Sequence, residues 1–354
     1  MEAARLNYAK GAVFGVAAGS IWAGWSAVTR LAVTTSLDAW DIPALRFGVA
    51  GLLLFPIVIR RGLARDRLGW LGLGGIIVGT GAPYALVAAA GLRFAPAYDQ
   101  GALNPGCMPL FVAVIAAIVL GEKPSGARKF GLALILSGAL VIIVWHDSAW
   151  SISRSFGDAL FLVASFLTAC FTVIMRQAKL DPIHAAALVS TGSLVIYVPI
   201  YLALRGFHVA AVPLADLTTQ VVFQGIVVTI ISLVFYGRAV VILGASGGSA
   251  FGALVPALSA VLAIPLLGEW PTASGWVGIV LISAGVYLAS GGPLPVMRRH
   301  ATMPPPDLLN RPPESETRPD PAGGETHSAS GQEGIAARSR SASSFTTSSK
   351  SIRA

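Results

Sequence analysis

Long hydrophobic runs separated by short polar segments make up most of the chain before about residue 290. The first run, from Gly11 to Val33, follows the basic residues Arg5 and Lys10. It is longer than the roughly 7–15 apolar residues of a cleaved signal peptide, so we expect a retained membrane span. Each of the nine runs that follow is near the roughly 20 residues that a helix needs to cross the hydrocarbon of a bilayer. They cover residues 42–59, 68–90, 99–120, 127–145, 157–175, 183–204, 218–240, 245–267 and 274–290.

The runs predict helices rather than the strands of a barrel. Backbone amides find no partners in lipid, so a spanning segment is either a helix or part of a closed barrel. The runs lack the alternation of polar and apolar positions that barrel strands require. We therefore expect an all-α integral membrane protein with ten transmembrane helices.

The end of the chain has a different composition. Residues 296–354 are rich in proline, serine, threonine and arginine and have almost no aromatic residues. Such a segment buries too little apolar surface to offset the entropy of ordering. We expect a disordered cytoplasmic tail, and its composition favours a solvated segment without an essential role. Phosphorylation, or contact with anionic lipid, at residues 338–341 is the alternative.

Composition supports the bilayer as the main solvent. Of the 354 residues, 55% are hydrophobic and only 12% are charged, whereas a soluble domain carries roughly 25% charged residues. The net charge of +8 comes from basic residues in short loops and in the tail rather than from one patch. It therefore favours orientation in a membrane over binding of nucleic acid.

The positions of lysine and arginine predict the orientation. One set of loops and span ends is rich in basic residues: Arg60, Arg61, Arg65, Arg67, Lys123, Arg128, Lys129, Arg176, Lys179, Arg238, Arg298 and Arg299. The other set carries mostly one per loop: Arg30, Arg46, Arg93, Arg154 and Arg205. Cytoplasmic loops carry the excess of positive charge. We expect a plasma (inner) membrane protein with both termini in the cytoplasm.

A stretch of the first half is repeated in the second half. Six pairs of identical residues lie 147 positions apart: Pro109 and Pro256, Gly121 and Gly268, Glu122 and Glu269, Pro124 and Pro271, Gly131 and Gly278, and Gly138 and Gly285. Arg30 and Arg176 match at the neighbouring offset of 146. The pattern indicates an internal duplication, with repeats at residues 1–147 and 148–295. Because each repeat holds five runs, the two copies are expected to be inverted, as is usual in secondary transporters.

These features resemble a known family. The ten runs, Leu45-Arg46-Phe47 at the start of the second run, and the repeated Pro, Gly-Glu-x-Pro, Gly and Gly pattern resemble the EamA-type permeases of the drug/metabolite transporter superfamily. The resemblance covers residues 11–290. It implies that spans one to four and six to nine surround a central cavity. It also implies secondary transport, most often export, of a small organic metabolite such as an amino acid or a drug-like compound. Import, or a membrane scaffold that transports nothing, is the alternative.

Polar and aromatic groups at membrane depth are the candidates for a substrate cavity. Burying an amide in lipid is costly, so we expect Asn104 and Gln224 to face the interior. The candidates are Trp22, Trp25, Tyr84, Gln100, Asn104, Gln224, Ser246 and Ser249. Hydrogen bonding between helices is the alternative role for the amides and serines.

Charged residues near the ends of the spans are candidates for coupling. Asp99 and Arg46 are expected near the outer side, where an ion pair could be broken and remade during transport. A desolvated Asp99 favours its neutral form, which makes a proton the candidate coupling ion. For Glu122 and Glu269, one interpretation is a helix-end role. The other is that they are gating charges that pair with loop arginines.

The prolines of the repeat predict irregular helices. Pro109 and Pro256 each remove a hydrogen bond within a span, so we expect a kink at each of them. In a transporter such kinks can turn backbone carbonyls toward a cavity.

The sequence carries no pattern that indicates an enzyme. Cys107 and Cys170 lie inside apolar runs, which excludes a disulfide framework or a cysteine zinc site. The spans lack a histidine pair at metal spacing and a glycine-rich phosphate loop. We therefore expect no catalysis, cofactor or metal. The expected partners are a small-molecule substrate, the bilayer and a proton, for a monomer or homodimer.

Overall fold

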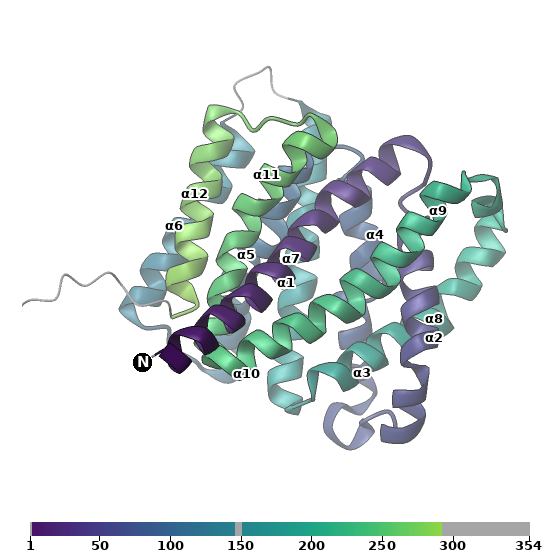
Figure 1. Ribbon diagram of the computed structural model, residues 1–354, viewed down its shortest axis with the longest axis horizontal. Helices are drawn as coiled ribbons and strands as arrows, with labels where there is room; N and C mark the ends of the chain where they lie inside the picture. The colour runs from purple at the N-terminus through teal and green to yellow at the C-terminus, as the bar shows by residue number, and fades with distance from the viewer. Residues whose placement is uncertain (1, 146–150, 292–354) are drawn as a thin grey trace, which may run out of the picture. The chain divides into compact units, whose positions relative to one another are not determined.

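The computed structural model describes residues 2–145 and 151–291, and every regular element in these ranges is helical (Figure 1). The α-helices are α1 (Glu2–Thr35), α2 (Asp41–Arg61), α3 (Arg65–Thr80), α4 (Ala82–Gly91), α5 (Ala97–Leu120), α6 (Gly126–Val144), α7 (Ile152–Ala178), α8 (Pro182–Arg205), α9 (Leu214–Gln220), α10 (Ser232–Ala250), α11 (Val255–Leu267) and α12 (Ala273–Ala289). Shorter elements are the 3₁₀-helices η1 (His208–Ala211) and η3 (Phe251–Leu254) and the π-helix η2 (Val221–Ile231). The expected disordered tail, residues 296–354, lies outside the described residues.

Eight helical stretches are long and apolar enough to cross a membrane. They are Tyr8–Thr35, Asp41–Arg61, Arg65–Gly91, Ala97–Leu120, Gly126–Val144, Ile152–Ala178, Pro182–Arg205 and Leu214–Gly244. Two shorter apolar helices, Phe251–Leu267 and Ala273–Ala289, follow. Large apolar side chains such as Ile118 and Val241 are 79% and 82% exposed, as expected where lipid rather than water is the solvent. The predicted all-α, multi-pass fold is confirmed.

Several spans are interrupted where the hydropathy pattern predicted continuous helices. The run 68–90 breaks at Gly81, which separates α3 from α4. The run 218–240 contains α9, the π-helix η2 and the start of α10. The run 245–267 contains the end of α10, the short helix η3 and α11. Hydropathy reports burial in lipid, and it does not report these changes of backbone geometry.

The two repeated prolines do not occupy equivalent positions. Pro109 lies inside α5, where its missing N–H removes a helical hydrogen bond. Pro256 lies in the first turn of α11, where an N–H would have no helical partner in any case. The expected interior kink at Pro256 is therefore wrong. The interruption falls before it, at Gly244 (φ 81°) and η3.

The repeated glycines lie at one helix–helix interface. Figure 1 shows α6 and α12 side by side, and they pack closely. A Cβ atom at Gly131 would lie 2.8 Å from the carbonyl oxygen of Gly285, and one at Gly138 would lie 2.7 Å from that of Gly278. Small residues allow backbones to approach in this way within membranes. A larger side chain at any of the four positions would force these helices apart.

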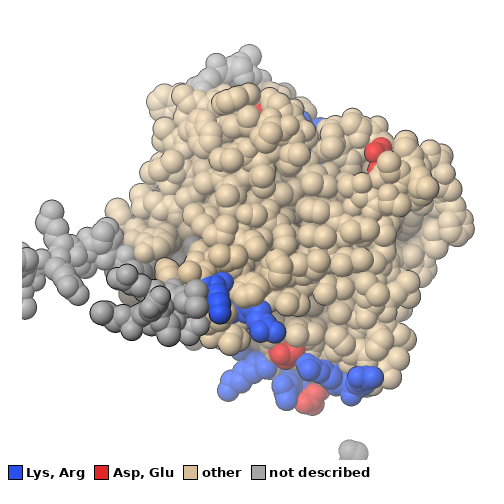
Figure 2. Space-filling model, viewed as in Figure 1, with Lys and Arg blue, Asp and Glu red and all other residues tan. Residues whose placement is uncertain are grey.

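Charged side chains are concentrated at one end of the helices. Figure 2 shows most of them at the lower edge, below a broad belt of uncharged surface. At this end α2 leads to α3 and α7 leads to α8, and Arg61 pairs with Asp181 at 2.9 Å between the two connections. We call it the Asp181 end. The opposite end, where α1 finishes and α5 and α7 begin, is called the Asp99 end.

Candidate functional site

A cavity of about 890 Å³ lies among α1, α2, α3, α7, α8, η2 and α10. Its size is within the range of small-molecule sites, roughly 300–1,000 Å³. It extends from Trp22 and Arg46, within their helices, to Asp181 and Arg238 at the Asp181 end. Most of its lining is apolar. The lining residues are Trp22, Arg46, Phe47, Thr80, Phe171, Met175, Asp181, Pro182, Ile183, Ala186, Val189, Ser190, Val228, Thr229, Ser232, Leu233, Val234, Tyr236, Gly237, Arg238, Val240 and Val241.

Aromatic and hydroxyl groups form one wall of this cavity. The Nε1 atom of Trp22 donates a hydrogen bond to Oγ of Ser232 at 3.0 Å, and its ring centroid lies 5.3 Å from that of Tyr236. Both contacts join α1 to α10. They fix the indole of Trp22, a predicted cavity residue, at the surface of the cavity.

Arg46 lies at the same depth, on α2. Its Nε atom donates a hydrogen bond to Oγ1 of Thr229 at 3.3 Å, and its guanidinium lies 5.3 Å from the ring centroid of Phe47. Neither contact carries a negative charge. The structure thus places at the cavity a residue that we expected near an outer ion pair.

Tyr84 and Asn104 form a polar pair near Arg46. The Nδ2 atom of Asn104 donates to Oη of Tyr84 at 3.1 Å, and the phenol of Tyr84 lies close enough to Arg46 to interact with its charge. Neither residue is among those that line the cavity.

The remaining predicted cavity residues are used between helices or fall outside the described side chains. Trp25 donates to Oε1 of Gln224 at 2.7 Å, and Nε2 of Gln224 donates to Oγ1 of Thr29 at 2.9 Å. Ser26 donates to Oε1 of Gln100. These contacts join α1 to η2 and to α5, which fits the alternative role as links between helices. Ser246 and Ser249 lie in α10, and their side chains are outside the described part.

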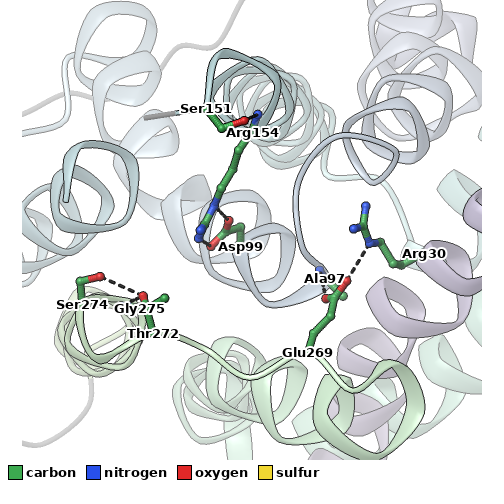
Figure 3. A network of polar contacts seen from close by, with 9 residues as sticks. All are labelled: Arg30, Ala97, Asp99, Ser151, Arg154, Glu269, Thr272, Ser274 and Gly275. Atoms are coloured by element: carbon green, nitrogen blue, oxygen red, sulfur yellow. Dashed lines mark hydrogen bonds and ion pairs between the residues drawn. The ribbon is translucent and has the colours of Figure 1, made fainter. Parts of the chain in front are cut away.

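A bidentate ion pair joins α5 and α7 at the Asp99 end. Figure 3 shows Arg154 of α7 reaching Asp99 of α5, with Nε to Oδ2 at 2.7 Å and Nη2 to Oδ1 at 3.0 Å. The Asp99 side chain is fully buried. The expected pairing of Asp99 with Arg46 is therefore wrong. The reason is that α7 begins at Ile152, earlier than the run at residue 157 predicted, which brings Arg154 beside the start of α5.

A second pair lies at the same end. Nε of Arg30 binds Oε1 of Glu269 at 2.8 Å, and Oε2 of Glu269 accepts from the backbone N–H of Ala97 at 2.7 Å. Arg30 also donates to the carbonyl oxygen of Leu92. The pair thus ties α1 to the end of α11 and to the segment between α4 and α5 (Figure 3). Its side chains are only 20% and 18% exposed.

The repeat-matched residues form an equivalent pair at the other end of their helices. Arg176 of α7 binds Oε1 of Glu122 at 2.6 Å, with side chains 45% and 36% exposed. In each repeat the glutamate follows a glycine, Gly121 or Gly268, that ends the helix with φ 66°. The arginine partners lie on helices rather than in the expected loops.

Asp158 is a buried carboxyl that sequence reasoning did not select as a site residue. The run 157–175 places it at the start of a span, but α7 begins six residues earlier and is capped by Ser151. Its carboxyl lies within hydrogen-bonding reach of the Asp99 carboxyl, a contact that needs a proton on one of the two groups. Without that proton, neither oxygen has a hydrogen-bond partner among the described residues. Asp99 and Arg154 lie near enough for their charges to act on it. Its sequence signal is an acidic residue just inside an apolar run.

The comparisons with known proteins agree on one family. The family model described as "EamA-like transporter family" matches residues 9–144 and 155–291. A "Probable terminal-alkyne amino-acid exporter" of Streptantibioticus cattleyicolor is 30% identical over 78% of this chain and 97% of its own length. An "Uncharacterized transporter" of Archaeoglobus fulgidus is 26% identical over 76% of this chain and 93% of its own. One crystal structure, 20% identical, matches 79% of this chain and 96% of its own with a TM-score of 0.53, which shows a shared fold.

Proposed function

We propose that this chain, which belongs to the EamA-like transporter family, exports a small organic metabolite across the plasma membrane by alternating access. The observation that carries the proposal is the cavity. It runs from Trp22 and Arg46 to Asp181 and Arg238, and its lining includes none of the ion-paired residues of the Asp99 end. This supports a transporter that is open at the Asp181 end and closed at the Asp99 end.

The charge distribution supports a cytoplasmic Asp181 end. Arg60 and Arg61 end α2 and Arg65 begins α3 at this end, and Figure 2 shows the basic side chains gathered there. Basic residues mark the cytoplasmic side of membrane proteins. The proposed state is therefore open to the cytoplasm, as an exporter must be to load its cargo.

Two symmetric sets of contacts support ten helices in two inverted repeats. The pairs Arg30–Glu269 and Arg176–Glu122 join equivalent residues at opposite ends of the helices. The approaches of Gly131 to Gly285 and of Gly138 to Gly278 exchange with each other under the same repeat. Inverted repeats reach a second state when the two halves exchange conformations around a central site. We propose that the largely buried pair Arg30–Glu269 stabilises the closed form of the Asp99 end.

Two buried carboxyls beside one guanidinium support a proton as the coupling ion. Asp99 and Asp158 carry two carboxyls beside the single guanidinium of Arg154. Both carboxyls are buried, and that of Asp158 has no hydrogen-bond donor among the described residues. A buried carboxylate without a partner is costly unless it binds a proton. The two carboxylates and the guanidinium together carry one net negative charge, and one bound proton makes this set neutral. Protonation therefore favours a closed Asp99 end.

The exporter direction and the amino-acid class draw on a relative. The Streptantibioticus cattleyicolor protein that matches most of this chain is named as a probable exporter of an amino acid. We propose a cargo of similar size, an amino acid or a compound derived from one. Import of such a compound is the alternative within the same fold.

The test is an untargeted comparison of metabolites in medium and cytoplasm. Cells that express the full chain are compared with cells without it and with cells that express a version truncated after Arg299. We expect one compound to rise outside and fall inside, with the truncated version still active. A fall outside and a rise inside would establish import. If no compound moves while the protein is present in the membrane, or if activity needs only the tail, the transporter proposal fails.

A further inference from the structure

We propose that Arg46 binds the carboxylate of the cargo, so that the cargo class is small carboxylates with an apolar body, including amino acids with apolar side chains. The inference rests on the proposed function, because it assigns the cargo of the same cavity. It gives Arg46 a binding role in place of the coupling role that the sequence suggested.

The first observation is that Arg46 has no counter-charge. Arg30 and Arg154 at the Asp99 end each bind an acid, at 2.8 and 2.7 Å. Arg46 binds no acid among the described residues, although it lies within a membrane-spanning helix. A charge at membrane depth is expensive and normally pairs with another group or marks a substrate path. An incoming anion supplies the missing charge.

The second observation is that the guanidinium is held in place. Thr229 accepts one of its five N–H donors at 3.3 Å, and the ring of Phe47 lies 5.3 Å away, within the range of a cation–π contact. No partner for Nη1 or Nη2 occurs in the described part of the chain. A planar guanidinium with two free nitrogens matches the two oxygens of a carboxylate.

The third observation is the balance of charge around the cavity. Three charged residues line it, namely Arg46, Asp181 and Arg238, and Asp181 is already bound to Arg61 at 2.9 Å. The cavity is therefore positive, and low-dielectric walls strengthen the attraction that such a site exerts on anions. A cationic cargo would find no unpaired carboxylate along this lining.

The rest of the lining selects an apolar body. Val189, Val228 and Leu233 lie on the wall together with the Trp22 and Tyr236 rings. Uncharged hydroxyls also line the cavity, namely those of Thr80, Ser190, Thr229, Ser232 and Tyr236. They can accept hydrogen bonds from an ammonium group without adding a charge. The cavity thus accepts an amino acid as well as a simple carboxylate, provided that its side chain is apolar.

The experiment measures binding of three probes to the purified full chain in detergent by calorimetry. Norvaline carries both charged groups, valerate only the carboxylate, and butylamine only the ammonium. We expect norvaline and valerate to bind and butylamine not to bind. Arg46→Gln should weaken valerate binding roughly 10- to 100-fold, as expected for hydrogen bonds to a charged group. Arg46→Lys should lie between, because it keeps the charge and loses the bidentate geometry.

A matched variant separates this role from a general loss of charge. Arg60 lies on the same helix, is exposed and lines no part of the cavity. Arg60→Gln removes one positive charge and should leave all three probes unaffected. If Arg46→Gln does not fold, Arg46→Lys and Thr229→Val provide the comparison. Arg46→Lys changes only the guanidinium, whereas Thr229→Val also removes the hydrogen bond that Thr229 donates to the backbone carbonyl of Gln224.

The outcomes distinguish this inference from the proposed function. Equal binding of butylamine and valerate, or unchanged valerate affinity in Arg46→Gln, overturns the inference and leaves export standing. An exported compound without an acidic group also overturns it. Conversely, Arg46-dependent binding of valerate with no metabolite moved in cells supports the carboxylate site and removes the transport proposal.

Discussion

The pairs Arg30–Glu269 and Arg176–Glu122 join repeat-matched residues, yet their surroundings differ. At the Asp99 end, Glu269 also accepts a backbone hydrogen bond from Ala97, and the paired side chains are largely buried. At the other end of the helices, the Glu122 side chain is 36% exposed, and among the described residues Arg176 is its only side-chain partner. The same residue pattern therefore yields one tightly held end and one loosely held end. A difference of this kind is expected of a protein that is captured in one of two states.

The two ends also differ in their buried carboxyls. Asp99 and Asp158 lie only at the Asp99 end, and the position that matches Asp99 in the second repeat is Ser246. The ion pairs are thus duplicated, whereas the proposed proton site is not. Coupling to a proton would then act on one end of the transport cycle and break its symmetry.

The expected effect with the greatest consequence for transport is the loss of coupling in Asp158→Asn. One pH unit equals about 1.4 kcal/mol, so a one-proton exchanger concentrates its cargo up to about tenfold across such a gradient. We expect vesicles with the variant to exchange cargo across the membrane but to show no accumulation driven by the gradient. The measurement is uptake of the exported compound into proteoliposomes with and without a pH difference.

Ser165→Ala is the control for that variant. Ser165 is another buried polar residue of α7 whose hydroxyl has no hydrogen-bond partner among the described residues. It should keep the response to the gradient. A full response in Asp158→Asn would exclude Asp158 as the proton carrier.

The next effect is on stability at the Asp99 end. Arg154→Met leaves the fully buried Asp99 without its cation, and breaking a buried pair on one side costs about 3–5 kcal/mol. The double variant Asp99→Asn with Arg154→Met removes both charges and should recover much of that loss. The free energy of unfolding in denaturant, measured in detergent, tests this order. If the double variant is less stable than the single one, the pair does not act as a buried charge pair.

A smaller difference should separate the two repeat-matched glutamates. Glu269→Gln weakens a largely buried pair that has a further backbone partner, and we expect a loss of about 1–3 kcal/mol. Glu122→Gln weakens an exposed pair, for which about 0–1 kcal/mol is typical. The melting temperatures of the two variants provide the measurement. Equal losses would mean that the two ends are held equally, which contradicts the comparison.

The sequence predicts some features of the two ends and not others. The hydrophobic runs predicted the membrane-spanning helices, and the pattern around Glu122 and Glu269 predicted the family. Both depend on composition and spacing, which are visible along the chain. The partner of Asp99 depended instead on where α7 begins, and a shift of less than two turns brought Arg154 into place. Short helix ends such as this one carry too little hydropathy signal to be located from sequence.

The candidate cavity residues show the same limit. Trp22 lines the cavity, whereas Trp25, three positions later on the same helix, is turned toward Gln224. Both are aromatic residues in an apolar run, so only the packing of α1 against η2 and α10 separates them. Arg46 was recognised as unusual because it is charged. Its role as the unpaired group of a cavity required the positions of the neighbouring helices.

The smallest expected effect concerns Asp181, at the exposed end. Partial burial acts to raise the pKa of its carboxyl, but hydrogen bonds from the His184 amide and from Arg61 outweigh it and hold that pKa below its usual value. The carboxylate therefore contributes stability above the unfolded pKa, near 3.9, and this contribution is lost as the pH falls through the lower folded value. Because the side chain is 51% exposed, the contribution of the ion pair is expected to be below about 1 kcal/mol.

Two substitutions resolve that contribution. Asp181→Asn keeps a good N-cap for α8 and loses only the pair with Arg61, so we expect a slightly lower melting temperature at pH 7 and no difference from the unaltered chain below the folded pKa. Asp181→Ala also loses the cap, which costs about 1 kcal/mol at any pH at which the carboxyl is ionised. Melting curves across the acidic range distinguish the two. If Asp181→Asn lowers the melting temperature as much as Arg154→Met does, the ion pairs hold the Asp181 end as firmly as the Asp99 end. An opening at only one end would then no longer follow from the ion pairs.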